Sequence, residues 1–125
     1  MSQVQKTILI VDDDPTIVKL LESVLSTQGF KTVVARDGLD AMVQVKNTNP
    51  DLILLDVMMP EINGYDVCRN LKFDNQYKNI PIILLTARDQ EIDPRVGQLM
   101  KIDYLQKPID RTLLISMIDK NLINV

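Results

Sequence analysis

The sequence contains no histidine and only one cysteine, Cys68, among its 125 residues. Without histidine the chain has no Ser-His-Asp or Cys-His catalytic site, no His-ligated zinc and no phosphohistidine of its own. A single cysteine cannot form an internal disulfide, so a reducing compartment is expected. Any phosphoryl group that this chain carries must therefore rest on another kind of side chain.

Long apolar runs and clusters of positive charge are also missing. The longest apolar stretches, such as Ile80–Leu85, are far shorter than the roughly 18 residues of a membrane-spanning helix. Met1–Lys6 lacks the apolar core of a signal peptide. The net charge is −3 and no Lys/Arg cluster is present, which argues against direct binding to nucleic acid or to an anionic membrane. We expect a cytoplasmic location.

The length and composition fit one globular domain. The 125 residues are 46% hydrophobic and 25% charged, with 4 glycines and 6 prolines, which is the size and composition of a single folded unit. Short aliphatic or β-branched runs alternate with segments whose apolar residues have helical spacing. We expect residues 1–125 to form a single domain.

Five strands are expected, each followed by a helix. The strands are Thr7–Val11, Thr32–Ala35, a third after Pro50–Asp51, a fourth introduced by Pro81, and Asp103–Gln106. The helices begin after Asp14, cover Leu39–Asn47, Tyr65–Lys72 and about Arg95–Met100, and begin again after Asp110. A loop with Pro60 and Asn63–Gly64 separates the third strand from its helix.

Three of these helices begin at typical N-cap residues, Asp14 before Pro15, Asp93 before Pro94, and Asp110. Apolar residues at helical spacing then define the face that each helix is expected to bury. For the second helix these residues are Leu39, Met42, Val43 and Val45, and for the last helix they are Leu113, Leu114, Met117, Ile118 and Leu122.

The alternation of strand and helix predicts an α/β fold with a parallel sheet covered on both faces. Parallel strands require crossover connections, and right-handed crossovers return each helix onto the sheet. Of the two common doubly wound arrangements, the flavodoxin-like order 2-1-3-4-5 fits a five-stranded chain of this length. Such folds bind ligands at the carboxyl ends of the strands.

Charged or polar side chains stand at the carboxyl ends of four expected strands. Asp12 and Asp13 follow the first strand, Asp56 ends the third, Thr86 the fourth, and Lys107 follows the fifth. Three carboxylates gathered at one edge repel one another unless a cation joins them. Mg²⁺ is the expected cation, because it binds a few carboxylates and keeps positions open for phosphate oxygens.

Asp56 is the expected nucleophile of this group. It ends a strand with no helix immediately behind it, so a helix-capping role explains it poorly, whereas capping explains Asp14 well. A carboxylate can attack a phosphoryl donor while a bound metal neutralises charge on the transferring group. Thr86 and Lys107 would then contact phosphoryl oxygens, although a threonine at a strand end is as often a turn residue.

The chain resembles the receiver domain of two-component response regulators, including chemotaxis regulators, over essentially its whole length. The segments that carry the resemblance stand in the family's order and spacing, and together they are specific. They are ILIVDDDP from Ile8, DLILLDVMMP from Asp51 with Gly64, PIILLTA from Pro81, and DYLQKP from Asp103. One departure precedes the fifth strand, where Met100, Lys101 and Ile102 replace the family's Gly-Ala-Asp turn.

The resemblance implies a chemical role for the acidic residues. Asp56 would accept a phosphoryl group from the phosphohistidine of a sensor histidine kinase or a phosphotransfer protein. Asp12, Asp13 and the backbone carbonyl of Met58 would hold Mg²⁺ together with Asp56. The protein would be a signalling switch in a phosphorelay, catalysing only its own phosphorylation and dephosphorylation.

The resemblance also implies how the aspartyl phosphate acts on the rest of the domain. Thr86 and Lys107 would contact the phosphoryl oxygens, and Thr86 with Tyr104 would reorient as a two-state equilibrium shifts. The changed surface would control a downstream protein target or an output domain. The sequence leaves open a homodimer formed on phosphorylation, and it identifies neither the kinase nor the target.

Two other interpretations compete with this one. Val11–Thr16 also fits the hhhhDxDxT motif of haloacid dehalogenase-type phosphatases, with Asp12 as the nucleophile. The acidic pair that follows the lysine in those enzymes is absent, because Asp110 and Asp119 belong to the last helix, and Asp56 would have no role. The second alternative, a receiver-like module that binds partners without phosphorylation, leaves the acceptor, acidic pair, threonine and lysine unexplained.

Overall fold

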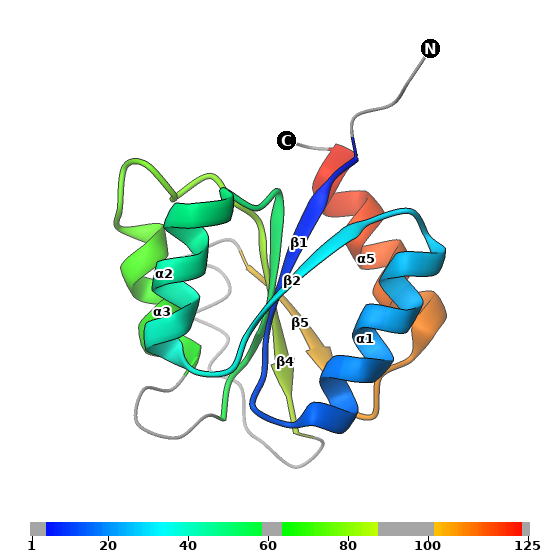
Figure 1. Ribbon diagram of the computed structural model, residues 1–125. Helices are drawn as coiled ribbons and strands as arrows, with labels where there is room; N and C mark the ends of the chain where they lie inside the picture. The colour runs from blue at the N-terminus through cyan, green and yellow to red at the C-terminus, as the bar shows by residue number, and fades with distance from the viewer. Residues whose placement is uncertain (1–4, 59–63, 88–101, 124–125) are drawn as a thin grey trace.

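The computed structural model describes residues 5–58, 64–87 and 102–123, and its centre is a five-stranded parallel sheet (Figure 1). The strand order is β2-β1-β3-β4-β5, as the sequence predicted. The strands are Thr7–Val11 (β1), Lys31–Ala35 (β2), Leu52–Asp56 (β3), Ile82–Thr86 (β4) and Asp103–Gln106 (β5).

Helices cover both faces of the sheet (Figure 1). The described helices are Pro15–Thr27 (α1), Gly38–Thr48 (α2), Gly64–Lys72 (α3) and Arg111–Ile123 (α5). α1 and α5 lie on one face, and α2 and α3 lie on the other. The helix predicted at Arg95–Met100 lies outside the described residues. None of the described helices has both the length and the apolar character needed to cross a lipid bilayer.

Aspartates fix the start of three helices. Asp14 Oδ1 accepts a hydrogen bond from the backbone N–H of Thr16 (2.9 Å), and Asp110 Oδ1 accepts one from Leu113 (3.0 Å). These contacts confirm two of the three predicted N-caps, and the third, Asp93, lies outside the described residues. Asp37 caps α2 in the same way, a role that the sequence analysis did not assign. Each cap satisfies an otherwise unpaired N–H group of the first helical turn.

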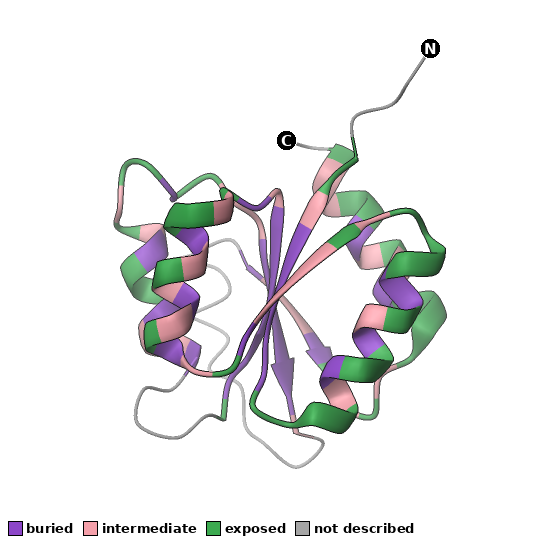
Figure 2. Cartoon of the chain, viewed as in Figure 1, coloured by how far each residue is buried: buried purple, intermediate pink, exposed green. Residues whose placement is uncertain are grey.

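Two layers of apolar side chains, one on each face of the sheet, form the core. Figure 2 shows the buried positions, in purple, along the strands and on the helices that flank them. Successive residues of a strand point to opposite faces, and β1, β3 and β4 are buried on both, so their sequences are almost uninterrupted aliphatic runs. The strand residues facing α2 and α3 are Leu9, Val11, Ile53, Leu55, Ile82 and Leu84. Those facing α1 and α5 are Ile8, Ile10, Leu52, Leu54, Ile83 and Leu85.

The predicted inward faces of α2 and α5 were wrong at several positions. Leu39, Val43 and Leu113 are 61%, 51% and 47% exposed, whereas the sequence placed them among the core residues. Both helices carry apolar residues on more than one side, so spacing alone does not define which side packs on the sheet. In α5 the fully buried positions are Leu114 and Ile118.

The amino ends of β1 and β3 are joined by a reciprocal pair of hydrogen bonds. Asp51 Oδ2 accepts from the backbone N–H of Thr7, and the backbone N–H of Asp51 donates to the Thr7 carbonyl, both at 2.8 Å. The two strands are therefore aligned at the edge of the sheet opposite the charged residues.

Candidate functional site

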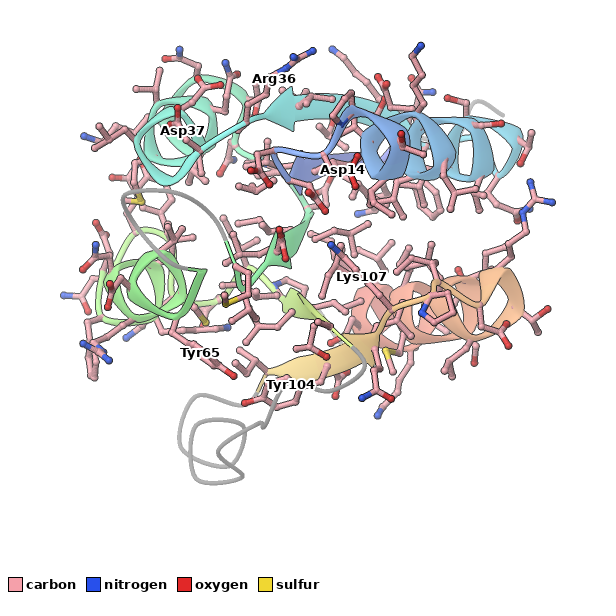
Figure 3. All side chains as sticks on the ribbon, turned by 90° about the horizontal axis from the view of Figure 1, so that it is seen from below. Asp14, Arg36, Asp37, Tyr65, Tyr104 and Lys107 are labelled. Atoms are coloured by element: carbon pink, nitrogen blue, oxygen red, sulfur yellow. The ribbon has the colours of Figure 1, made fainter. Side chains whose placement is uncertain are left out.

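Three of the predicted site residues lie on the same face of the sheet, at its carboxyl edge. Asp12, Asp56 and Lys107 each stand two residues after a core residue that faces α1 and α5. Those core residues are Ile10, Leu54 and Leu105. Because side chains alternate along a strand, this even spacing directs all three functional groups to the same side. Figure 3 looks onto this edge, where Lys107 extends toward the ends of β1 and β3.

Asp12, Asp13 and Asp56 form a compact acidic cluster. One carboxylate oxygen from each residue lies within 4.8 Å of the corresponding oxygens of the other two. Asp12 is fully buried and Asp56 is 5% exposed, while Asp13 is exposed at the edge. The convergence predicted from the strand order is therefore present. A group of three oxygen donors at this separation fits a hard divalent cation such as Mg²⁺.

Lys107 forms ion pairs with two members of this cluster. Its Nζ lies 3.2 Å from Asp12 Oδ2, which accepts a hydrogen bond from it, and 3.5 Å from Asp56 Oδ1. The sequence predicted that the lysine would face the cluster, but its ion pair with Asp12 was not foreseen. The other oxygen of Asp12 accepts from the backbone N–H of Asp14 at 2.9 Å, so both oxygens of this buried carboxylate have partners.

The environment of Asp56 raises the pKa of its carboxyl from 3.8 to about 6. Burial is the largest cause, and the negative charge of Asp12 adds to it. The Lys107 ammonium and the backbone N–H of Met58, which donates to Asp56 Oδ1 at 3.3 Å, act in the opposite direction. The positive charge and the hydrogen bond around Asp56 therefore do not fully stabilise its ionised carboxylate. A bound cation would stabilise it further.

Thr86 and Tyr104 extend the opposite face of the sheet. Thr86 continues the series Ile82 and Leu84, which faces α2 and α3, and the Tyr104 side chain packs against the same core layer. Figure 3 shows Tyr104 on the α3 side of the edge, together with Tyr65. Thr86 is fully buried, and within the described part of the chain its Oγ1 has no hydrogen-bond partner. A buried hydroxyl in this state is destabilising until a partner reaches it.

The backbone of Thr86 is linked to Lys107. The carbonyl of Thr86 accepts a hydrogen bond from the backbone N–H of Lys107 at 2.7 Å, which joins the carboxyl ends of β4 and β5. The peptide bond between Lys107 and Pro108 is cis. The site thus has two parts: the acidic cluster with the Lys107 ammonium on the α1 and α5 side, and Thr86 with Tyr104 on the α2 and α3 side.

Gly64 is a residue of this edge to which the sequence analysis assigned no role in the site. It was expected at the end of the loop before a helix that starts at about Tyr65, and it is the first residue of α3 and is buried. Its backbone N–H donates to the carbonyl of Val57 at 2.8 Å, directly behind Asp56. The Asn-Gly pair favoured a turn because glycine tolerates unusual backbone angles, but steric contact is the relevant property here.

The single cysteine does not belong to the site. Cys68 lies in α3, is fully buried, and burial raises its pKa to about 11. A nucleophilic cysteine requires a lowered pKa and access to substrate. The sequence-based interpretation of Cys68 as a core residue is confirmed.

Comparisons with known proteins agree on one family. The family described as "Response regulator receiver domain" matches residues 8–119 of the chain. The DNA-binding response regulator MtrA of Mycolicibacterium smegmatis is 42% identical over 109 residues, which are 86% of this chain and 46% of that protein. Protein PilG of Pseudomonas aeruginosa is 33% identical over 112 residues, covering 89% of this chain and 83% of PilG.

The fold has a close match among solved structures. A putative response regulator from Chloroflexus aurantiacus superposes with a TM-score of 0.89 and 33% sequence identity, covering 96% of this chain and 99% of that one. The chain spans just under half the length of MtrA, whereas it spans most of PilG.

Proposed function

Because this chain belongs to the response regulator receiver domain family of two-component systems, we propose that it is a phosphorylation-controlled switch in which Asp56 accepts the phosphoryl group. The donor is the phosphohistidine of a sensor histidine kinase or a phosphotransfer protein. The observation that carries this proposal is the placement of the Asp56 carboxylate, which is 5% exposed, beside two further carboxylates and 3.5 Å from the Lys107 ammonium.

Asp56 has the properties of a nucleophile for this transfer. With a pKa of about 6, its carboxyl is mostly ionised at neutral pH. A carboxylate oxygen forms the new P–O bond, the P–N bond of the phosphohistidine breaks, and the departing imidazole takes up a proton. Lys107 Nζ, already beside Asp56, offers a positive charge to the oxygens of the phosphoryl group as it arrives.

The acidic cluster fits Mg²⁺ as the cofactor of this reaction. Asp12, Asp13 and Asp56 would hold the ion, with the backbone carbonyl of Met58 as a fourth protein ligand. When bound, Mg²⁺ would offset the charge of the carboxylates and of the phosphoryl group. The raised pKa of Asp56 supports this proposal, because burial and, to a smaller extent, the charge of Asp12 disfavour the ionised carboxyl more than the Lys107 ammonium stabilises it.

The switch itself is assigned to Thr86 and Tyr104. The Oγ1 of Thr86, which has no partner among the described residues, is a hydrogen-bond donor that a phosphoryl oxygen on Asp56 would attract. Movement of Thr86 toward Asp56 frees space on the α2 and α3 side, where Tyr104 packs, and shifts the domain toward a second conformation. The output is a changed surface around β5 and α5.

We assign the switch to a single domain over residues 1–125, at work in the cytoplasm. The partner on the output side is a protein, either a segment of the same polypeptide or a separate molecule. Both arrangements have a parallel among the relatives, because MtrA extends well beyond the matched region whereas PilG barely does. The DNA binding named for MtrA is a property of that longer protein, and the −3 net charge here gives no electrostatic basis for contact with nucleic acid.

The decisive experiment is to incubate the protein with Mg²⁺ and radiolabelled acetyl phosphate and to map the labelled residue. Label is expected on Asp56, and an Asp56→Asn variant should take none. Label on Asp12, or repeated turnover of a phosphomonoester, would instead identify the phosphatase alternative. A pull-down with the beryllium fluoride form of the protein then searches for the output partner.

A further inference from the structure

We propose that Gly64 is a positioning residue for the site: the absence of a Cβ atom lets α3 start directly against the backbone of Asp56 and Val57. The inference rests on the proposed function, because it concerns the placement of the acceptor and of the Met58 carbonyl. Gly64 touches neither substrate nor metal in this assignment.

The position that a Cβ atom of residue 64 would take is occupied by main-chain atoms. A Cβ atom built on Gly64 would lie 2.3 Å from the carbonyl oxygen of Asp56, 2.8 Å from the Cα of Val57 and 3.0 Å from the carbonyl carbon of Asp56. Real Cβ atoms essentially never approach other atoms this closely. A side chain in this position could rotate away from the added Cβ atom. Because the neighbours are main-chain atoms, the contact can be relieved only by a shift of the backbone.

Conformational freedom does not explain this glycine. Gly64 has an ordinary helical backbone, and the glycine with a positive φ in the described chain is Gly29, at +88°. Alanine is the better helix former, so local propensity at Gly64 would favour alanine. The requirement for glycine is therefore steric and comes from contact with the residue that we assign as the phosphoryl acceptor.

The two elements in contact are each held in place from behind. Val57 is 1% exposed, and its N–H donates to the carbonyl of Leu85 at 3.1 Å, so it is fixed to β4. α3 is anchored in the core by Val67, Cys68 and Leu71, each at most 1% exposed. Neither Val57 nor α3 can move freely, so a methyl group at Gly64 must distort the backbone from Asp56 to Met58.

That segment contains the atoms on which the chemistry depends. Asp56 supplies the carboxylate, and Met58 supplies both the N–H that donates to Asp56 Oδ1 and the carbonyl proposed as a metal ligand. A small displacement of the Val57 peptide reorients both groups of Met58. Mutation of groups that orient metal ligands from outside the first coordination shell typically weakens metal binding by about 10- to 100-fold, and we expect an effect of this size here.

The chain offers a matched control in Gly29→Ala. Gly29 follows α1, and a Cβ atom there meets nothing within 4 Å, but its φ of +88° is unfavourable for alanine. Both substitutions add one methyl group and both lower stability, one through backbone strain and the other through contact. Only Gly64→Ala should affect the site.

The test compares the parent, Gly29→Ala and Gly64→Ala proteins in three measurements. These are the amide resonances of Val57 and Met58 in chelator, the Kd for Mg²⁺ by calorimetry, and the rate and KM of acetyl phosphate labelling. We expect displaced resonances, a Kd for Mg²⁺ raised about tenfold or more, and a slower maximal rate for Gly64→Ala alone. If Gly64→Ala is unfolded in buffer, all three proteins are compared in trimethylamine N-oxide, which favours folded states.

Two outcomes overturn the inference: Gly64→Ala with parental resonances and a Kd within about twofold of the parent, or an equal loss of Mg²⁺ affinity in Gly29→Ala. Failure of the proposed function is a separate result. If the parent takes no label on Asp56, the assignment of the acceptor falls, while the resonances and the Mg²⁺ titration still decide the role of Gly64.

Discussion

Lys107 Nζ lies 3.2 Å from Asp12 Oδ2, a contact between residues 95 positions apart that joins the end of β5 to the end of β1. Asp12 is fully buried, so the lysine offsets a charge that water does not reach. Removal of one partner from such a pair leaves the other charge uncompensated, which is usually more destabilising than the pair was stabilising.

Lys107→Met should therefore lower the free energy of unfolding by about 1–3 kcal/mol in chelator at pH 7, less than the loss of a fully buried pair would, because the Lys107 side chain is 23% exposed. Methionine keeps most of the apolar stem but removes the charge. Urea denaturation measures the effect, with the exposed Lys19→Met as the control. Added Mg²⁺ should recover more stability in Lys107→Met than in the parent, because the ion offsets the same carboxylates. Equal stability of variant and parent in chelator would contradict the importance of this pair.

Asp56 should make the metal-free protein less stable as the pH rises. Its folded pKa of about 6 lies above the ordinary value of 3.8, so the folded state binds the proton more tightly than the unfolded state does. The contribution of Asp56 is most favourable below about pH 4 and is lost as the pH rises through about 6. At about 1.4 kcal/mol per pKa unit, the loss is at most about 3 kcal/mol.

Asp56→Asn should remove this dependence. In chelator the variant should gain stability over the parent progressively between pH 4 and 7, as measured by urea denaturation at each pH. The control is Asp37→Asn, which retains a helix-capping side chain and lies outside the acidic cluster. A constant difference between parent and Asp56→Asn across this range would show that the pKa of Asp56 is not raised.

Thr86→Val should separate stability from switching. Valine removes a buried hydroxyl that has no partner within the described residues and keeps nearly the same shape. We expect the unphosphorylated protein to gain up to about 1 kcal/mol in stability. The same variant should lose the response of the Tyr104 ring resonances to beryllium fluoride, whereas Thr86→Ser should retain it. A full Tyr104 response in Thr86→Val would remove Thr86 from the switch.

The substitutions Asp13→Ala and Asp14→Ala should have opposite effects on Mg²⁺ binding and on stability. Asp14 caps α1 through its bond to the Thr16 N–H, so Asp14→Ala should lower stability by about 1 kcal/mol and leave Mg²⁺ affinity nearly unchanged. Asp13 is exposed and belongs to the acidic cluster, so Asp13→Ala should weaken Mg²⁺ binding about tenfold or more with little effect on stability in chelator. Thermal unfolding and calorimetric titration of both variants measure the contrast.

The sequence was sufficient for the sheet and for the identity of the residues at its edge. The aliphatic runs that end in Asp12, Asp56 and Thr86 are short and favour strands buried on both faces, and the alternation with helices leaves few possible orders. Strand order in turn brings the carboxyl ends together. The sequence therefore predicts that Asp12, Asp13 and Asp56 form one cluster, as they do.

Features that depend on contacts between elements were not predictable in this way. The apolar residues of α2 and α5 occur on more than one side, so only packing shows that Val43 and Leu113 face solvent. Prediction of the ion pair between Lys107 and Asp12 would require the positions of the ends of β1 and β5 relative to each other along the strand direction. The steric role of Gly64 requires the distance between a strand end and a helix start, which residue spacing does not contain.

The reciprocal hydrogen bonds of Asp51 and Thr7 keep β1 and β3 in register at the edge farthest from the acidic cluster. The alignment of these two central strands therefore does not depend on the ionisable residues of the acidic cluster. Substitutions that remove charges at the opposite edge should change the stability of the protein but leave these strands aligned, so a folded variant that takes no phosphoryl group reports on the lost site.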